Sequence, residues 1–275
     1  MGVRSTLRRV AGHFLGDSSE RLQRMIFREA ARGFPLAQSG FPGTLALPRE
    51  FGRRLPERVV ELLLAHTVYA PGARVLDVGH SNIMLCHRML LERLAPPRRL
   101  TGIDIAPPAY DTRSLYERSV VADITRTGME AASFDRIWCI STLEHVGMDN
   151  TVYTTNFRRG GGMDAAAIAE MARLLAPAGQ LLITVPFGKF EDHGWFRNYD
   201  LRSWRALLAP LRSGADVHEL YFAYSPDAGW TAAEPEGLSA TGYNDNANAG
   251  ASGLAVAMVC TPPGRNERNP EAHSQ

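Results

Sequence analysis

Acidic residues stand directly after three short apolar segments, where they could recognise a nucleoside. Asp77 lies in the run Val-Leu-Asp-Val-Gly that ends at Gly79, Asp104 ends Gly-Ile-Asp, and Asp123 ends Val-Ala-Asp. The carboxylate of Asp104 can accept both hydroxyl protons of a ribose, and Asp123 offers an acceptor for an adenine amino group. Gly79 lets the backbone of a tight turn approach a bound cofactor. A lone aspartate at such a place usually caps a helix or turn, but three in register favour one shared ligand.

Hydroxyl, carboxylate and imidazole side chains follow a fourth apolar segment. The residues after Ile140 are Ser141, Thr142, Leu143, Glu144 and His145. His145 is a candidate general base because the intrinsic pKa of histidine lies near neutrality; the ordinary alternative is a hydrogen-bonded structural imidazole. Glu144 would position a substrate group, or else would accept hydrogen bonds from the backbone of a neighbouring loop. Both readings stay open for both residues.

A loop rich in aromatic and charged residues is the expected docking place for an acceptor. Residues 186–197 read Pro-Phe-Gly-Lys-Phe-Glu-Asp-His-Gly-Trp-Phe-Arg. Pockets for small molecules combine apolar walls with a few polar groups, which this loop could supply. His193 is therefore a second candidate base, and a surface loop with a few anchoring rings is the alternative. No group of histidines and acids has metal-ligand spacing, so we predict no metal site.

The elements that must position these residues alternate between strands and helices. Short apolar runs ended by small or acidic residues predict strands at 74–78, 100–103, 119–122, 136–140, 180–185, 216–221 and 254–260. Helical spacing predicts helices at 83–94, 165–175 and 201–208 between them. This order indicates βα units around a parallel sheet. Ligands bind beyond the carboxyl ends of such strands, which is where the candidate residues stand.

Other segments flank or interrupt this repeat. Residues 1–70 are expected to be a helical extension, with helices at 18–32 and 48–69, and residues 71–262 the main domain. The long loop 224–252 is expected to be an insertion that covers the substrate. Trp230 and Tyr243 in it are lid candidates, with ordinary packing as the alternative. The polar tail 263–275 is expected to be disordered.

Composition limits the possible partners and location. The chain has 275 residues and a formal net charge of +1, so no summed positive field favours nucleic acid, which is excluded as an expected partner. Its three cysteines are widely separated, which argues against a disulfide framework. No apolar run reaches the ~20 residues that a membrane span needs. We expect a cytoplasmic protein, whose oligomeric state the sequence does not indicate.

The ordered motifs resemble the class I S-adenosylmethionine-dependent methyltransferase superfamily. The matching pieces are Val-Leu-Asp-Val-Gly at 75–79, Gly-Ile-Asp at 102–104, Ala-Asp-Ile at 122–124, Phe-Asp-Arg-Ile at 134–137, Leu-Glu-His-Val at 143–146 and Leu-Leu-Ala-Pro-Ala-Gly at 174–179. The resemblance implies a Rossmann-like α/β fold: a seven-stranded, mostly parallel sheet with an antiparallel last strand, helices on both faces and the N-terminal helical extension. It implies S-adenosylmethionine as cofactor, held by Asp77, Gly79, Ser81, Asp104, Ile105, Asp123, Ile124, Ser141 and Thr142.

The glycine-rich turn departs from the superfamily pattern. Where that pattern has its second and third glycines, this sequence has Ser81 and Ile83. Ser81 is expected to meet the methionyl carboxylate of the cofactor, and Ile83 to begin a helix. The loosened turn and the run Ser-Thr-Leu-Glu-His-Val-Gly resemble a subgroup from bacterial sugar, surface-glycan and secondary-metabolite pathways.

The resemblance implies transfer of a methyl group to a small-molecule, sugar or glycan-like acceptor, with a sugar-like hydroxyl oxygen as the first expectation. His145, Glu144 and His193 would be the catalytic residues, with Glu144 beside the sulfonium or the substrate. Three alternatives are a degenerate methyltransferase fold that acts as a binding or scaffold subunit, a non-methylating enzyme that uses the same cofactor, and a nicotinamide-dependent oxidoreductase. The last begins with a similar strand and turn, but its G-x-G-x-x-G run is missing.

Overall fold

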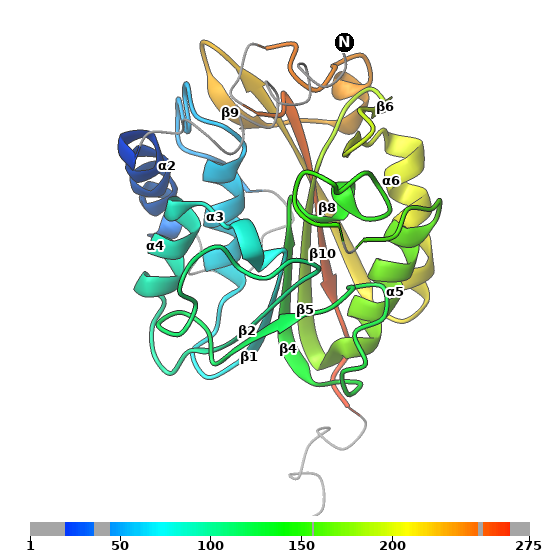
Figure 1. The fold of residues 1–275 in the computed structure, drawn as a ribbon. Coiled ribbons are helices and arrows are strands. Elements are labelled where there is room, and N and C mark those ends of the chain that lie inside the picture. The colour runs from blue at the N-terminus through cyan, green and yellow to red at the C-terminus, as the bar shows by residue number, and fades with distance from the viewer. Residues whose placement is uncertain (1–19, 36–44, 156, 247–249, 265–275) are drawn as a thin grey trace, which may run out of the picture.

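The computed structural model describes residues 20–35, 45–155, 157–246 and 250–264. Within them, one sheet of eight strands runs in the order β3-β2-β1-β4-β5-β10-β8-β9. The first five of these strands are parallel, and β10 runs antiparallel to both β5 and β8. The sheet forms the middle layer of the molecule, with helices on either side (Figure 1). The predicted Rossmann-like α/β fold is thereby confirmed.

Most strands begin and end close to the predicted positions, but β5 begins at 175 rather than 180 and β8 ends at 225 rather than 221. The strands are β1 (Arg74–Val78), β2 (Arg99–Asp104), β3 (Arg118–Val121), β4 (Phe134–Ile140), β5 (Leu175–Pro186), β8 (Asp216–Ser225), β9 (Gly229–Ala232) and β10 (Gly253–Cys260). The eighth strand, β9, lies inside the predicted insertion and pairs antiparallel with β8. It was not predicted, because four residues starting with a glycine carry almost no periodic signal. A separate two-stranded sheet joins β6 (Glu191–Asp192) and β7 (Arg197–Asn198).

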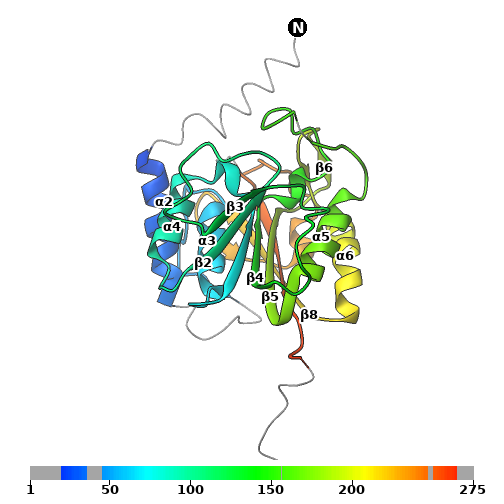
Figure 2. The same ribbon diagram turned by 60° about the horizontal axis from the view of Figure 1, so that its bottom comes forward.

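Side chains alternate between two cores, one on each face of the sheet. Val75 packs with α2 (Glu20–Gly33), α3 (Arg58–Val68) and α4 (Leu85–Arg93), whereas Leu76 packs with α5 (Met163–Leu174) and α6 (Leu201–Leu208). The same alternation along a buried strand follows from the two-residue period of extended chain. Figure 2 shows the two helical layers on opposite sides of the sheet. Both faces are covered, as parallel strands require.

Two helices begin later than the sequence predicts. The helix expected from residue 48 starts at Arg58, because Glu50, Gly52 and Arg54 have positive φ angles of 57°, 65° and 63°, which no right-handed helix contains. The helix expected at Ile83 starts at Leu85. A short 3-10 helix at 80–82 precedes it, and Ile83 itself is extended, with ψ of 138°.

The predicted insertion is partly built into the core. Trp230 on β9 is fully buried, and its Nε1 donates to the carbonyl oxygen of Leu55 at 3.0 Å. Trp230 therefore anchors the segment against the N-terminal part of the chain and is not a lid residue. The predicted tail lies outside the described residues, except for 263 and 264. The start of the first predicted helix, residues 18 and 19, lies outside them as well.

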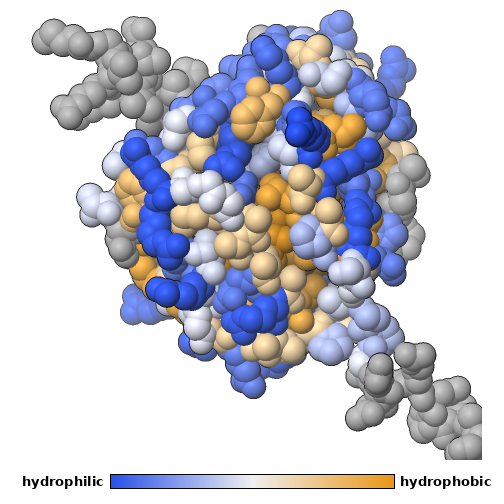
Figure 3. Space-filling model, turned by 90° about the vertical axis from the view of Figure 1, so that its right-hand side faces the viewer, coloured by the Kyte–Doolittle hydropathy of each residue, from blue (hydrophilic) through white to orange (hydrophobic). Residues whose placement is uncertain are grey.

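Figure 3 views the molecule from the side of α5 and α6, where hydrophilic side chains surround a smaller apolar area. Among the described residues, no helix is long and apolar enough to span a membrane.

Candidate active site

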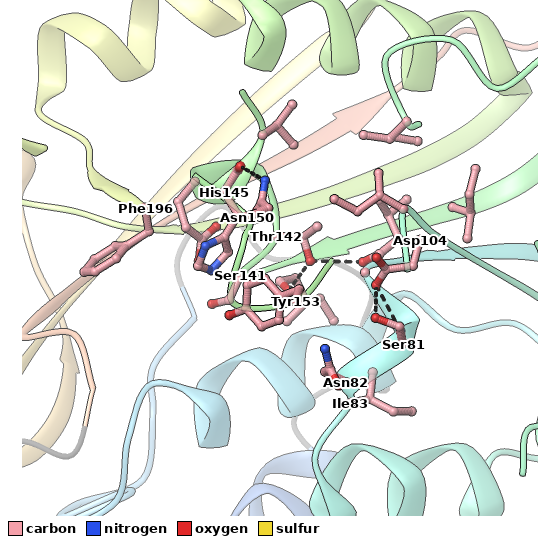
Figure 4. A pocket seen from close by; sticks show the side chains of 18 of the residues that line it. Ser81, Asn82, Ile83, Asp104, Ser141, Thr142, His145, Asn150, Tyr153 and Phe196 are labelled. Carbon is pink, nitrogen blue, oxygen red and sulfur yellow. Dashed lines mark hydrogen bonds and ion pairs between the residues drawn. The ribbon is translucent and has the colours of Figure 1, made fainter. Parts of the chain in front are cut away.

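A pocket of about 200 Å³ lies at the carboxyl ends of β1, β2 and β4, next to β3. Eleven of the twelve predicted site residues line it: Asp77, Gly79, Ser81, Asp104, Ile105, Asp123, Ile124, Ser141, Thr142, Glu144 and His145. In Figure 4, Ser81 and Asp104 lie on one side of the pocket and His145 and Phe196 on the other. The sheet topology thus gathers residues that are far apart in the sequence, as expected at strand ends. His193 is the predicted residue that does not line the pocket.

The turn after β1 requires glycine at position 79. Gly79 has a φ of +92°, and its N–H donates to the carbonyl oxygen of Ile103 on β2 at 2.9 Å. A Cβ atom at this position would overlap the Thr142 side chain. The bare backbone therefore lets β1 and the β4 turn meet at the pocket floor, which suits the close approach of a cofactor.

Ser81 supports Asp104 directly. Its Oγ and its backbone N–H both donate to Asp104 Oδ2, at 2.6 and 3.0 Å. The expectation that the Ser81 hydroxyl meets the methionyl carboxylate of the cofactor finds no support in this arrangement, because that hydroxyl donates its one proton to Asp104. Among the described residues, Asp104 Oδ1 accepts only the N–H of Ala106, at 3.2 Å, which leaves lone-pair capacity on this oxygen. Asp104 therefore fits a ribose hydroxyl.

Asp123 keeps one carboxylate oxygen for a ligand. Its Oδ1 accepts the backbone N–H and the hydroxyl of Thr125, at 2.8 and 2.7 Å. Its Oδ2 is 4.0 Å from a guanidinium nitrogen of the largely exposed Arg158. Ile105 and Ile124, which each follow one of the two acids, add apolar wall to the same pocket. This combination of acceptors and apolar surface fits an adenosine moiety.

Asp77 is held beneath the pocket by other residues of the chain. Its Oδ2 accepts from the Tyr116 hydroxyl at 2.6 Å and lies 3.2 Å from His87 Nε2. Burial alone would raise the pKa of Asp77, but the neighbouring His87 and the hydrogen bonds from His87 and Tyr116 outweigh it and lower the pKa. Asp77 is thus ionised and is 1% exposed, so it braces the turn from below.

Ser141 and Thr142 form the floor beyond β4. Thr142 Oγ1 donates toward the carbonyl oxygens of Val78 and Ile140, at 3.1 and 3.0 Å. Ser141 has a positive φ of 41°, and its hydroxyl donates to Glu61 Oε1 at 2.6 Å. These bonds fix the two hydroxyls to the protein, so the floor is rigid and is tied to α3.

His145 presents one ring nitrogen that can accept a proton. Its Nδ1 lies 2.9 Å from the carbonyl oxygen of Trp195; a carbonyl only accepts, so Nδ1 carries the hydrogen and Nε2 the lone pair. Burial lowers the pKa of His145, and the hydrogen bond to Trp195 raises it by a smaller amount. The resulting pKa is about 4. The imidazole is therefore neutral near pH 7. It is a weaker base than an unperturbed histidine would be.

Two buried carboxylates stand near His145. Glu144 is 3% exposed, and its Oε1 is 3.9 Å from His145 Nε2. Burial raises the pKa of Glu144 well above its usual value, and the negative charges of Glu61 and Glu57 add to this. Glu57, from the turn just before α3, is 5% exposed and lines the pocket as well. Burial, followed by the charge of Glu61, raises the pKa of Glu57 to about 7.

The loop 186–197 contributes aromatic walls rather than a base. Trp195 and Phe196 line the pocket, whereas His193 is stacked on Phe196 with ring centres 4.4 Å apart and lies 3.6 Å from Glu191 Oε2. His193 therefore packs behind an aromatic ring of the wall, which does not support its role as a general base. Tyr243, the second lid candidate, does line the pocket, and its ring centre is 4.7 Å from that of Phe196.

The pocket residues that sequence reasoning missed include Glu57, Arg58, Asn150 and Tyr153. Glu57 and Arg58 begin a strongly apolar helix, and charged residues at its first turn could have suggested a buried polar role. Asn150 and Tyr153 come from the loop after β4; Asn150 Nδ2 donates to the His145 carbonyl oxygen at 2.9 Å. No signal in the sequence distinguishes them from ordinary loop residues.

Comparisons with known proteins agree with the motifs. Residues 76–183, about two fifths of the chain, match a family model described as a methyltransferase domain. No curated protein is significantly similar in sequence to this chain.

Several solved structures are similar to this chain at low sequence identity. The 1,6-didemethyltoxoflavin-N1-methyltransferase of Burkholderia thailandensis has 15% identity and a TM-score of 0.48, covering 74% of this chain and 77% of that one. The N-methyltransferase NodS of Bradyrhizobium japonicum WM9 has 14% identity and a TM-score of 0.44, covering 90% and 99%. The [4+2]-cyclase SpnF has 15% identity and a TM-score of 0.48, covering 91% and 98%. The predicted resemblance rests on the family match and the ordered motifs, and it is confirmed over residues 76–183.

Proposed function

We propose, from the premise that residues 76–183 form a domain of the class I S-adenosylmethionine-dependent methyltransferases, that this chain O-methylates a small-molecule, sugar or glycan-like acceptor. The observation that carries the proposal is the single pocket in which Gly79, Asp104 and Asp123 lie on the cofactor side and His145 on the acceptor side. A cytoplasmic location and the exclusion of nucleic acid belong to the same proposal, because the net charge of +1 provides no general attraction for a polyanion.

The cofactor side uses groups that the chain already orients. Asp104 would accept a ribose hydroxyl through Oδ1, Asp123 would accept the adenine amino group through Oδ2, and the backbone at Gly79 leaves space for the methionyl part. Bound S-adenosylmethionine would supply an electrophilic methyl group. Holding an acceptor in line with such a group can contribute about 7–11 kcal/mol to the acceleration.

His145 is the group best placed to take the hydroxyl proton. Its Nδ1–H is bound to the Trp195 carbonyl, which fixes the ring and leaves Nε2 as the acceptor. Because its pKa is lowered to about 4, the imidazole cannot hold the proton of a free hydroxyl at neutral pH. Proton removal must therefore accompany formation of the new oxygen–carbon bond, when the hydroxyl becomes strongly acidic.

The proposal is tested by measuring binding and transfer separately. Calorimetry should show S-adenosylhomocysteine binding to the wild-type chain, and Asp104→Ala should weaken it about 100-fold or more. Asp216→Ala, which changes an exposed acid at the far end of β8, is the matched control. Transfer of an isotopically labelled methyl group to a panel of sugars and small alcohols is then followed by mass spectrometry.

Each outcome has a distinct meaning. Product that gains one methyl group on oxygen supports the proposal, and a methylated nitrogen or carbon contradicts the oxygen acceptor. No heat at millimolar S-adenosylhomocysteine would favour a binding or scaffold subunit. Tight nicotinamide binding without S-adenosylhomocysteine binding would favour an oxidoreductase.

A further inference from the structure

Two buried carboxyl groups on the acceptor side of the pocket, those of Glu57 and Glu144, have no lysine or arginine partner among the described residues. Glu61 has a cationic partner: Arg58 lies 3.0 Å from its Oε2, and the hydroxyls of Ser141 and Thr184 donate to its Oε1 at 2.6 and 2.7 Å. In the part of the chain that the structure describes, no lysine or arginine pairs directly with Glu57 or Glu144. On the acceptor side, the two lining acids are thus the ones without a directly paired cation in the described part of the chain.

Glu144 in particular has an unused oxygen. The side chain is 3% exposed, and its Oε2 is buried with no hydrogen-bond partner. Its other oxygen is 3.9 Å from His145 Nε2, which is too far for a hydrogen bond. A buried carboxylate without a partner is unfavourable unless a cation or donor arrives. The wall of the pocket at Glu144 is therefore complementary to a ligand that brings one.

Glu57 also has capacity for a ligand. Its Oε2 accepts the N–H of Ala251 at 3.0 Å, and no side chain is bound to its Oε1 in the described part of the chain. Glu57 and Glu144 both raise the pKa of the Tyr243 hydroxyl, after the larger effect of burial, so the three side chains are electrostatic neighbours. Glu57 reaches the pocket from the turn before α3, and Glu144 from the end of β4.

Aromatic rings surround the same part of the pocket. The ring centres of Phe196 and Tyr243 are 4.7 Å apart, and those of Trp195 and Phe196 are 4.8 Å apart. Aromatic faces attract ammonium groups, and the attraction increases where water is excluded. Carboxylates combined with aromatic walls are thus suited to an organic cation rather than to a neutral sugar or a phosphate.

We propose that the acceptor carries an amino group, bound as an ammonium between Glu144 and Glu57 against the rings of Phe196 and Tyr243. This inference rests on the proposed methyl transfer and specifies its substrate class: an amino alcohol or amino-sugar-like molecule. An ammonium held by carboxylates has no free lone pair, so it serves as a binding group while a hydroxyl of the same molecule faces His145. The acids on the cofactor side, Asp104 and Asp123, belong to the opposite end of the pocket.

The inference is tested with a minimal pair of probes on the full-length chain saturated with S-adenosylhomocysteine. The pair is 2-aminoethanol, which is positively charged at pH 7.5, and N-acetyl-2-aminoethanol, which is neutral. Binding is followed by saturation-transfer NMR titration. We expect the wild type to prefer the charged probe by about tenfold or more, the equivalent of one carboxylate–ammonium interaction in a partly dry site. This comparison needs no variant, so it does not depend on the folding of one.

Substitutions then locate the preference. Glu144→Gln should reduce it to about twofold or less, and Glu57→Gln should reduce it in part, because each substitution removes a carboxyl group that gives up its proton to solvent and pairs with the ammonium when the ligand binds. Glu92→Gln, an exposed acid on α4, is the control and should keep the full preference. The affinity for S-adenosylhomocysteine should stay within about twofold in all three variants.

Four results would overturn the inference, and the first three concern the two probes. They are equal binding of the two probes by the wild type, no binding of 2-aminoethanol up to about 50 mM, and a preference that survives Glu144→Gln together with Glu57→Gln. A fourth is selective weakening of S-adenosylmethionine but not of S-adenosylhomocysteine in these variants, since the carboxylates would then serve the sulfonium. A chain that does not bind S-adenosylhomocysteine fails the proposed function instead.

Discussion

Replacing Ser81 by alanine is expected to weaken the binding of S-adenosylhomocysteine by about 5- to 30-fold. The Ser81 hydroxyl donates to Asp104 Oδ2 at 2.6 Å, a short bond to a carboxylate oxygen. Asp104 keeps the N–H groups of Ser81 and Ala106, at 3.0 and 3.2 Å, so the variant loses one of three donors. One charge-assisted bond lost with partial compensation corresponds to about 1–2 kcal/mol.

The assay is isothermal calorimetry with S-adenosylhomocysteine at fixed ionic strength. Ser81→Gly, which restores the glycine of the superfamily pattern, should bind at least as weakly as Ser81→Ala, because it also frees the backbone. Ser213→Ala, which removes an exposed hydroxyl far from the pocket, should match the wild type. An unchanged or lower dissociation constant for Ser81→Ala would refute the view that Ser81 orients Asp104. It would mean that the hydroxyl competes with the ribose.

Further predictions concern the base, the turn and a buried acid. His145→Ala should lower kcat about 100-fold or more; because the pKa of His145 is about 4, kcat of Glu57→Gln, which lacks the acid with a pKa of about 7, should be flat between pH 6 and 9, and a kcat that rises through pH 6.5 in that variant would contradict this. Gly79→Ala should abolish S-adenosylhomocysteine binding, since the new Cβ overlaps Thr142; the control Gly128→Ala has the same positive-φ strain but open space, and should retain binding. Glu57 has its pKa raised from 4.5 to about 7, so its stabilising contribution is complete below pH 4.5 and is lost as the pH rises through 7. Urea denaturation at pH 5 and pH 8 should therefore show a loss of up to about 3 kcal/mol in the wild type that is largely absent in Glu57→Gln. Equal losses in both proteins would assign the pH dependence to other groups.

The strand ends were predictable because each combines an apolar run with a turn residue or an acid. Those signals are local. Because the carboxyl ends of parallel strands lie at the same edge of the sheet, Gly79, Asp104 and Asp123 are brought together there independently of the conformation of the loops. The roles of the hydroxyls were less accessible. Whether Ser81 faces a ligand or Asp104 depends on a side-chain rotation that spacing does not determine.

Residues from outside the repeat carried only a weak signal in the sequence. Glu57 and Arg58 reach the pocket because α3 packs across the sheet, which is a tertiary contact without a sequence period. His193 shows a different difficulty: its residue type and its loop suit a base, but whether its ring faces the pocket or packs on Phe196, as it does here, depends on a tertiary contact. Strand β9 was missed inside the long loop, because it is defined by its pairing with β8 and by the burial of Trp230, and both are tertiary contacts.

The place of β10 between β5 and β8 bears on how the polypeptide acquires its shape during synthesis. Residues 253–260 provide the hydrogen-bonding partners for one side of β5 and one side of β8, so both strands have open edges until these residues leave the ribosome. The five parallel strands can assemble earlier, whereas β8 and β9 form a hairpin in which the edge of β8 that later pairs with β10 is still unpaired. Exposed borders of this kind recruit other chains. Slow translation between residues 225 and 253 would therefore lengthen the period in which newly made chains can aggregate.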